Sequence, residues 1–297
     1  MSEIYRHLIL RRGHFLFGLA AILFWVDSFG FSEAIQNLLK YFKISLTMVL
    51  GSMVAGGTAL GGGAVAFPVL TKLMAFTPQD AKVFSLAIQS FGMTAASIAI
   101  LCKRIKFYPK FLLISLVTAL PCALFSLYFL SDLVPRLWIK IVFSSLLVLF
   151  AFAILTQKSH VAVANTLLNR AKVIAILTVG AVGGVLSGIL GSGADICLFA
   201  LLALAFKSDL KAATATSVML MAVISVFCSF INLMMLDALT PQIFSYVHAA
   251  IPVVIVGAPL GAWICSELPT KILVRILVSL IACEALFTVF EIGAIIR

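Results

Sequence analysis

Long apolar runs with few charges constrain this chain more than any other feature. Nine of them lie near residues 13–31, 44–74, 83–101, 111–130, 137–155, 172–206, 212–236, 245–265 and 272–290. A helix needs roughly 20 apolar residues to cross the hydrocarbon core of a bilayer. Of all residues 63% are hydrophobic and 11% are charged, which is more apolar surface than a soluble fold of this length can bury. The sequence therefore predicts an all-α polytopic membrane protein, and it excludes a soluble enzyme, a nucleic-acid-binding protein and a secreted disulfide scaffold.

The first apolar run resembles a signal peptide, because it follows Arg6, Arg11 and Arg12. No small-x-small cleavage site comes after it, so we expect an uncleaved transmembrane helix that sets the topology. The next stretch, Ser32 to Lys43, has apolar residues at helical spacing. This pattern fits either a short helix in the membrane interface or a plain linker.

Glycine is concentrated in two short windows. Six glycines lie between Gly51 and Gly63 and six more between Gly180 and Gly193, out of nineteen in the chain. Small residues often allow close packing of membrane helices. A glycine triplet, however, costs a helix about 1 kcal/mol per residue relative to alanine. We therefore predict that each window breaks its helix.

The two windows belong to an internal duplication. The sequence LGGGA from Leu60 matches LGSGA from Leu190, and the AF pairs that end at Phe76 and Phe206 match at the same offset. Further matches join Asp80 and Lys82 to Asp209 and Lys211, and SDLVPR from Ser131 to SELPTK from Ser266. The expected organisation is an N-terminal helix with an interfacial linker (1–43), a first repeat (44–156), a cytoplasmic linker (157–171) and a second repeat (172–297). Duplications of this kind are typical of secondary transporters.

The distribution of basic residues favours one topology. If each glycine-broken segment crosses once, Lys and Arg divide 11 to 10 between the two faces. If each segment is a hairpin that enters and leaves on the same face, they divide 14 to 7 with the N-terminus cytoplasmic, as the positive-inside rule prefers. Each repeat then has a broken helical hairpin and three transmembrane helices, and the two repeats are inverted. Their glycine loops approach the membrane midplane from opposite sides.

Two facing loops of non-helical backbone predict a cavity, because such backbone is tolerated at membrane depth only beside protein or water. Their exposed N–H groups suit a small anion. The predicted binding residues come from the loops and from the helices after them: Gly61, Gly62, Gly63, Gln89, Gly191, Ser192, Gly193, Thr216 and Ser217. Pro68 is expected to kink the first segment. The alternatives are that the glycines only allow half-helices to cross closely and that the hydroxyl groups bond to backbone.

Two acidic residues fall inside apolar segments. Asp195 follows the second glycine loop at a position where the first repeat has Val65. An acid at this depth is a functional hypothesis, so Asp195 is a candidate proton-coupling group; a loop-capping carboxyl at the start of a half-helix explains it equally well. Glu284 is expected to bond to another helix. No pair of histidines stands at ligand spacing, so we expect neither a metal nor a cofactor.

At the glycine loops the sequence resembles the TauE/SafE sulfite exporter family. The resemblance rests on GGTALGGGAVAFPVL from Gly56, GGVLSGILGSGADICLF from Gly183, ATATS from Ala213 and IPVVIVGAPLGAWICSELPTK from Ile251. It covers roughly residues 44–290 and leaves the first helix outside. In the second repeat Ala194 replaces the third glycine and Leu198 stands where Pro68 would be matched. The resemblance implies transport of sulfite, sulfonates and related anions across the cytoplasmic membrane.

The expected function is therefore alternating-access transport of a small, sulfur-containing oxyanion, coupled to protons through Asp195. A passive anion channel and a membrane-embedded assembly partner are the alternatives. No HExxH, GxSxG or paired-carboxylate motif supports an intramembrane enzyme. The expected partners are the anion, protons and the lipid bilayer. The sequence leaves open the direction of transport and the oligomeric state, including a homodimer.

Overall fold

The computed structural model describes residues 16–27, 30–58, 70–71, 74, 76–131, 133–156, 168–269 and, near the C-terminus, 271–272, 274–275, 278–279, 281–282 and 285–286. All regular elements in these residues are helical. In chain order they are α2 (Phe31–Lys40), α3 (Phe42–Gly57), α5 (Pro78–Cys102), α6 (Pro109–Phe125) with η2 (Ser126–Leu130), α7 (Arg136–Thr156), α8 (Arg170–Leu190), α9 (Ala194–Ala200) with η3 (Leu201–Ala205), α10 (Leu210–Met234) and α11 (Pro241–Glu267). A further helix, Leu16–Asp27, precedes α2.

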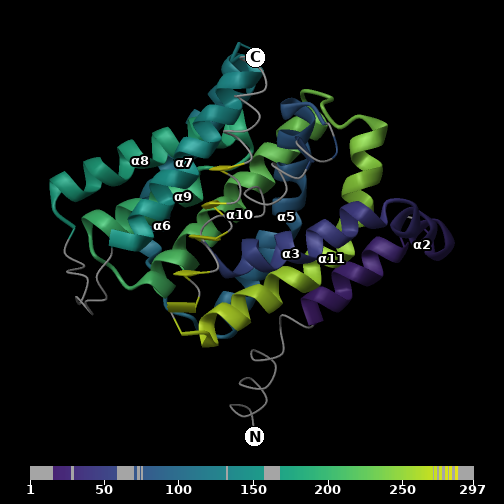
Figure 1. The fold of residues 1–297 in the computed structure, drawn as a ribbon, viewed down its shortest axis with the longest axis horizontal. Helices are drawn as coiled ribbons and strands as arrows, with labels where there is room; N and C mark the ends of the chain where they lie inside the picture. The colour runs from purple at the N-terminus through teal and green to yellow at the C-terminus, as the bar shows by residue number, and fades with distance from the viewer. Residues whose placement is uncertain are drawn as a thin grey trace, which may run out of the picture.

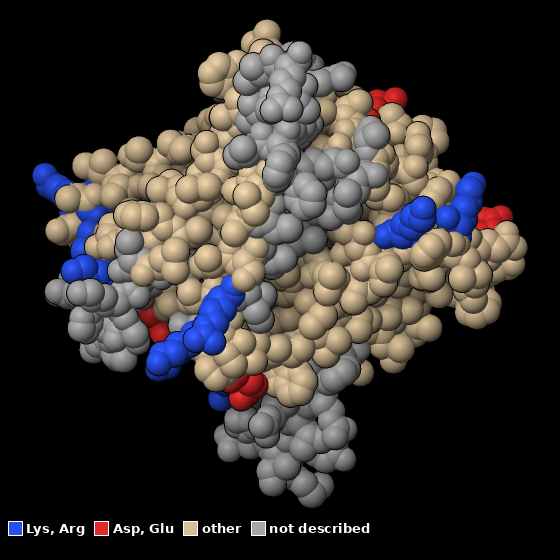
Figure 2. Space-filling model, viewed as in Figure 1, with Lys and Arg blue, Asp and Glu red and all other residues tan. Residues whose placement is uncertain are grey.

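Five of the described helices are long and apolar enough to cross a membrane, and the number is six if Leu16–Asp27 and α2 count as one span. The five are α5, α6 with η2, α8, α10 and α11. In the face drawn in Figure 2, Lys, Arg, Asp and Glu form a few separate groups, and the rest of the described surface is uncharged. The prediction of a polytopic α-helical membrane protein is confirmed.

The N-terminal helix and α2 meet at an angle of 98°. The indole N–H of Trp25 donates to the backbone oxygen of His248 in α11, at 3.1 Å. The amide nitrogen of Asn37 in α2 donates to the backbone oxygen of Ser245, at 2.9 Å, and lies 2.8 Å from His248 Nδ1. Residues 31–40 therefore form a helix, and the alternative of a plain linker is wrong. Its large residues Phe31 and Leu39 are exposed.

Helices α3, α5 and α11 run in the same direction. Along α3 and α11, Ser45 donates to the backbone oxygen of Ala249, and Gly57 lies against Cys265 further along both helices. Along α5, Gly92 lies against Val254, and the Lys103 ammonium group at its end lies over the Trp263 ring. The N-terminal helix runs the opposite way, because Gly18 lies near Ile255 and Trp25 near His248.

Helices α6, α8 and α10 run in the other direction. Thr118 and Ser126 of α6 and η2 donate in turn to the backbone oxygens of Leu177 and Val185 in α8. The start of α6 is tied to α10 by a hydrogen bond from the Tyr108 backbone to Thr216. Figure 1 shows α6 and α8 on one side of the bundle, α3 and α11 on the other, and α5 and α10 between them.

Glycines allow the two outer helix pairs to approach closely. A Cβ atom on Gly56 of α3 would overlap the backbone of Ala258 in α11, and one on Gly184 of α8 would overlap that of Ala119 in α6. Without a water-driven attraction between helices in lipid, such close contact is a main source of packing energy. These glycines therefore have the packing role that the sequence left open, while others in the same windows form a turn.

Aromatic contacts bring together the ends of each glycine-containing segment. Tyr41, before α3, and Phe76, before α5, both lie against the Tyr246 ring, at centroid distances of 4.8 and 5.1 Å. In the second half, the Lys172 ammonium group near the start of α8 lies 5.8 Å from the centre of the Phe206 ring, which follows η3. Each segment thus starts and ends at the same end of the bundle.

Candidate functional site

The second glycine window forms a sharp turn between α8 and α9. Gly191 has φ of 82° and Gly193 has φ of 143°, and α9 starts directly afterwards at Ala194. Residues with a Cβ rarely adopt these angles. The prediction that this window breaks its helix is confirmed, and the break falls at the predicted residues.

The chain reverses direction at this turn. A Cβ atom on Gly183 would lie 2.7 Å from the Cα atom of Ala194, although eleven residues separate the two in sequence. The Ser187 hydroxyl of α8 accepts a hydrogen bond of 3.0 Å from the Ala194 backbone N–H. It thereby satisfies one of the N–H groups that the start of a helix leaves without an intrahelical partner.

Asp195 caps this turn and is completely buried. Its Oδ1 atom accepts hydrogen bonds from the backbone N–H groups of Gly193 and Ile196, both at 3.0 Å. Its Oδ2 atom is also buried and has no hydrogen-bond partner among the described residues. The loop-capping role is therefore present in the structure, and it uses only one of the two carboxyl oxygens.

Gln89 of α5 joins the same turn from another helix. Its amide nitrogen donates to the backbone oxygen of Gly191 and to the Ser85 hydroxyl, both at 2.8 Å. This side chain is 1% exposed and so faces the protein interior. Its Oε1 atom and the buried Ser192 hydroxyl lack partners among the described residues. Together with Asp195 Oδ2, they give the turn three polar atoms that can accept a hydrogen bond or bind a proton, and such atoms need an explanation when buried.

The structure does not bring Thr216 and Ser217 to this turn. The Thr216 hydroxyl donates to the backbone oxygen of Ala212 and accepts from the Tyr108 N–H, and the Ser217 hydroxyl donates to Thr214. Both hydroxyl groups thus have the backbone-bonding role that was the alternative to anion binding.

The position of the second turn also differs from the predicted one. Gly191 lies against Lys82, the fifth residue of α5, and so close to one end of the bundle. The sequence predicted a loop at the membrane midplane. The reason is the length of α8, whose 21 residues extend about 32 Å, enough to cross the hydrocarbon core before the turn.

Gly61, Gly62, Gly63, Pro68 and Glu284 lie outside the described residues.

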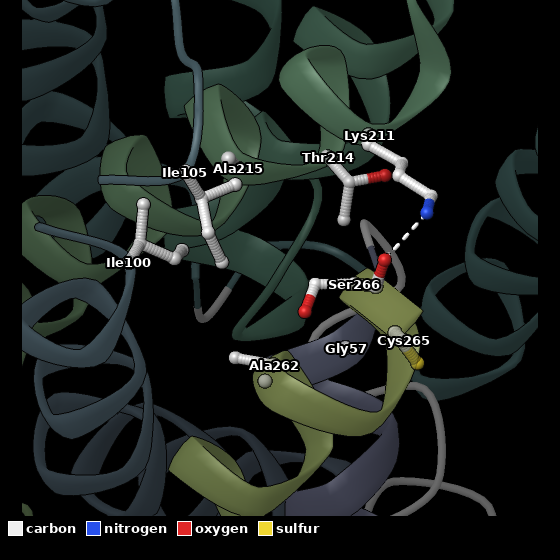
Figure 3. Close-up of a pocket in the computed structure, with 10 residues that line it drawn as sticks. Gly57, Ile100, Ile105, Lys211, Thr214, Ala215, Ala262, Cys265 and Ser266 are labelled. Carbon is white, nitrogen blue, oxygen red and sulfur yellow. Dashed lines mark hydrogen bonds between the residues drawn. The ribbon is translucent and has the colours of Figure 1, made fainter. Parts of the chain in front are cut away.

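A small cavity lies at the end of α3, the helix that leads to the first glycine window. It is at the opposite end of the bundle from Gly191. The cavity has a volume of about 30 Å³ and is lined by Gly56, Gly57, Ile100, Ile105, Lys211, Thr214, Ala215, Ala262, Cys265 and Ser266. Figure 3 shows the Lys211 ammonium group at its edge, donating to the Ser266 backbone oxygen. This volume holds roughly two water molecules.

Sequence reasoning did not assign a role to Lys82, Ser187 or Lys211. The sequence did contain a sign that the two lysines matter, since Lys82 and Lys211 occupy equivalent positions in the internal duplication. Ser187 gave no comparable signal, because its contact with Ala194 depends on how the chain reverses.

A family model described as Sulfite exporter TauE/SafE matches residues 44–288. The chain belongs to the TauE/SafE sulfite exporter family. TauE/SafE proteins are membrane transporters rather than enzymes, and this chain is a multi-pass membrane transport protein. The match starts within α3, so the N-terminal helix and α2 lie outside the TauE/SafE region. No curated protein and no solved structure gives a significant match to this TauE/SafE chain.

Proposed function

We propose that this protein is a secondary transporter of a small oxyanion, such as sulfite, a sulfonate or a related organosulfur anion. The observation that carries the proposal is the glycine-broken backbone at Gly191–Gly193 inside a TauE/SafE protein, beside the buried Ser192 hydroxyl, which has no partner among the described residues and can donate to an anion. The Asp195 Oδ2 and Gln89 Oε1 atoms at the same turn can only accept, so they suit a proton rather than the anion. Amide N–H groups and hydroxyl groups bind oxyanions well, and glycine lets the anion approach the backbone.

We infer an inverted repeat from the helix directions. In the first half, α3 and α5 run one way and α6 the other; in the second half, their counterparts α8 and α10 run opposite to α3 and α5, and α11 opposite to α6. Such repeats support alternating access, in which two similar halves exchange conformations. The small volume of the cavity near Lys211 fits this mechanism, since an anion of several heavy atoms enters it only when the helices move apart.

The charged residues support an orientation in the membrane. At the end where α6, α8 and α10 begin, the described basic residues are Lys103, Arg104, Lys106, Lys110, Arg170, Lys172, Lys207, Lys211 and Lys271. The acidic residues Asp27, Glu33, Asp80 and Asp237 lie at the other end, together with Lys40, Lys43 and Lys82, while Asp209 and Glu267 lie at the basic end. We assign the basic end to the cytoplasm and place the protein in the cytoplasmic membrane with its N-terminus inside.

Transport is tested in proteoliposomes that contain the purified protein. Labelled sulfite, taurine and methanesulfonate are supplied with and without a pH gradient, and protein-free vesicles serve as the control. Accumulation of an anion above its external concentration supports a coupled transporter. Flux that only equalises the two concentrations indicates the passive channel, and the absence of flux for all anions indicates an assembly partner.

Asp195 is the proposed coupling residue. The Asp195 carboxyl is completely buried, so ionising it is costly, and a negative charge beside the turn repels an anion. Proton binding at the free Oδ2 atom removes both costs when the anion binds. We expect Asp195→Asn to keep downhill flux but to lose accumulation driven by a pH gradient.

The matched control is Asp209→Asn, since Asp209 caps α10 through the Ala212 N–H but is exposed. This variant should keep the pH response of the wild type. An unchanged pH dependence of transport in Asp195→Asn would remove the coupling role.

A further inference from the structure

We propose that Lys82 and Lys211 form two matched anion-binding sites, one at each end of the transport path. Each lysine belongs to one repeat and lies beside the glycine segment of the other repeat. The inference deepens the proposed function, on which it rests, by naming the cationic groups that receive the anion at the two faces.

The first site is built around Lys82, in the second turn of α5. Its side chain is 4% exposed, and its ammonium group donates to the Ser131 hydroxyl at 2.9 Å. A Cβ atom on Gly191 would lie 2.9 Å from the backbone oxygen of Lys82 and 3.3 Å from its Cγ atom. The lysine of the first repeat therefore packs directly against the glycine turn of the second repeat.

The second site is built around Lys211, in the first turn of α10. Its ammonium group donates to the backbone oxygen of Ser266, and it lines the cavity together with Gly57, Thr214 and Cys265 (Figure 3). Gly57 is the last residue of α3, just before the first glycine triplet in the sequence. The lysine of the second repeat thus lies at the end of the helix that leads to the first repeat's glycine window.

The two sites match in sequence as well as in their contacts. Lys82 and Lys211 are equivalent in the duplication, and their partners Ser131 and Ser266 open the equivalent sequences SDLVPR and SELPTK. A pairing that occurs once could be an accident of packing. The same lysine–serine pairing at both ends of the molecule indicates a shared role in the two repeats.

The sites lie at opposite ends of the bundle. Ile100 of α5 lines the same cavity as Lys211, and it follows Lys82 by eighteen positions, which is about 27 Å along a helix. The hydrocarbon core of a bilayer is about 30 Å thick. One lysine therefore lies close to each membrane face, where it can attract an anion from the adjacent solution.

The chemistry of both sites suits an oxyanion. Lysine ammonium groups bind oxyanions as point charges, and glycine backbone can approach such a ligand without a side chain in between. In the structure each ammonium group donates to serine, through a hydroxyl at one end and a backbone oxygen at the other. An arriving anion can compete with the serine oxygen for the ammonium group. The exchange would release the serine end of one helix and so couple anion arrival to helix movement.

Transport kinetics measured separately from each membrane face test the two lysine sites. Influx and efflux of labelled sulfite are measured in vesicles of known protein orientation for Lys82→Gln and Lys211→Gln. We expect each variant to raise the KM at one face at least about tenfold, the lower limit for electrostatic focusing, and Lys→Arg at each position to restore most of it. The KM at the other face should stay within about twofold.

The matched control is Lys110→Gln, because Lys110 is also a first-turn lysine at the basic end but is exposed. It should leave both KM values unchanged. If the two lysine variants lower the maximal rate equally from both faces, or lose thermal stability without a sided change in KM, the lysines only connect helix ends and the inference is wrong. A wild type without flux would contradict the proposed function itself.

A second measurement examines Lys211 without any transport. In a variant with Cys265 as the sole cysteine, two methanethiosulfonate reagents of similar size are compared, one carrying a sulfonate and one a trimethylammonium group. We expect the ratio of the anionic to the cationic reaction rate to fall about tenfold in Lys211→Gln. The ratio separates the charge at the cavity from changes in thiol reactivity. An unchanged ratio, or a thiol that reacts with neither reagent, overturns the Lys211 site.

Discussion

At the scale of single residues, the turn between α8 and α9 depends on two glycines with positive φ. Gly193 has an angle that side chains do not tolerate, and a Cβ there would lie 2.8 Å from the Cβ of Leu186. Gly191 is in the left-handed region, which is less restrictive, but a Cβ would lie 2.9 Å from the Lys82 backbone oxygen. Both positions therefore combine backbone strain with a steric limit.

We expect Gly193→Ala to destabilise the folded protein by about 1–3 kcal/mol, the usual cost of a residue in a sparsely populated backbone region. Gly191→Ala should cost a similar amount. Thermal unfolding of the purified protein measures both. Gly18→Ala is the control, because the nearest atom to its added Cβ is 3.9 Å away and alanine favours the helix. A turn that accepts alanine at both positions would contradict this account.

The hydrogen bond from Gln89 to Gly191 is a second residue-scale contribution. Gln89→Leu keeps the apolar bulk but leaves the Gly191 oxygen without this donor, so we expect a loss of about 1–3 kcal/mol in stability, the cost of a buried unsatisfied group. Chemical or thermal unfolding measures the loss. Ser90→Ala serves as a neighbouring control, since among the described residues the Ser90 hydroxyl bonds to Ala87 within its own helix. Equal stability of the two variants would show that the Gln89 bond contributes little.

At the scale of elements, the N-terminal helix and α2 are an addition to the TauE/SafE region that is held by a few specific contacts. Trp25 and Asn37 bond to backbone oxygens in α11, and Trp25 also packs against the His248 ring at a centroid distance of 5.0 Å. The rest of α2 contributes little buried surface, since Ala34 is its only buried residue. The addition is therefore held mainly by the contacts of Trp25 and Asn37 with α11, rather than by packing along its whole length.

Trp25→Phe removes the indole donor but keeps an aromatic ring. We expect it to lower the unfolding temperature by a few degrees, consistent with the loss of one hydrogen bond, and to leave anion flux within about twofold. Leu23→Met, at a side chain that is 59% exposed on the same helix, should change neither. A strong loss of flux in Trp25→Phe would mean that the addition takes part in transport.

The helices and the second break could be predicted from the sequence, because apolar runs, glycine clusters and helical spacing are local signals. Residues 31–40 gave such a pattern, and they form α2. The depth of the second turn could not be predicted, since the sequence does not show how far α8 continues before Gly191. The local bond of the Thr216 hydroxyl to Ala212 was an alternative that the sequence offered, but its bond from Tyr108 joins helices distant in sequence, and the contact of Ser187 with Ala194 depends on the chain reversal; no local pattern revealed these two contacts.

At the scale of the whole molecule, the helix directions place the loop between α5 and α6 and the loop between α10 and α11 at opposite ends. The first loop contains Arg104 and the second contains Asp237, and both residues have positive φ outside the helices. The positive-inside rule assigns the Arg104 loop to the cytoplasm. The Asp237 loop should therefore lie on the opposite face of the membrane.

Arg104→Cys and Asp237→Cys, in a protein without other cysteines, should react with a membrane-impermeant thiol reagent from opposite faces. We expect Asp237→Cys to be labelled in intact cells and Arg104→Cys only in inverted vesicles. Labelling of both from the same face would overturn the inferred inverted repeat, and the reversed pattern would overturn only its orientation.

The contacts between helices of the two halves also affect the order in which the protein can assemble during synthesis. The glycine-containing helix α8 meets its partner α6, which lies about sixty residues earlier in the chain, as in the contact of Gly184 with Ala119. Helix α3 contacts α11 through Gly56 and Ala258, a partner that the ribosome adds some two hundred residues later. Contacts so distant in sequence form late. During synthesis, α3 must therefore remain in the bilayer without its final neighbour until α11 is made, as must the N-terminal helix and α2, whose Trp25 and Asn37 also bond to α11.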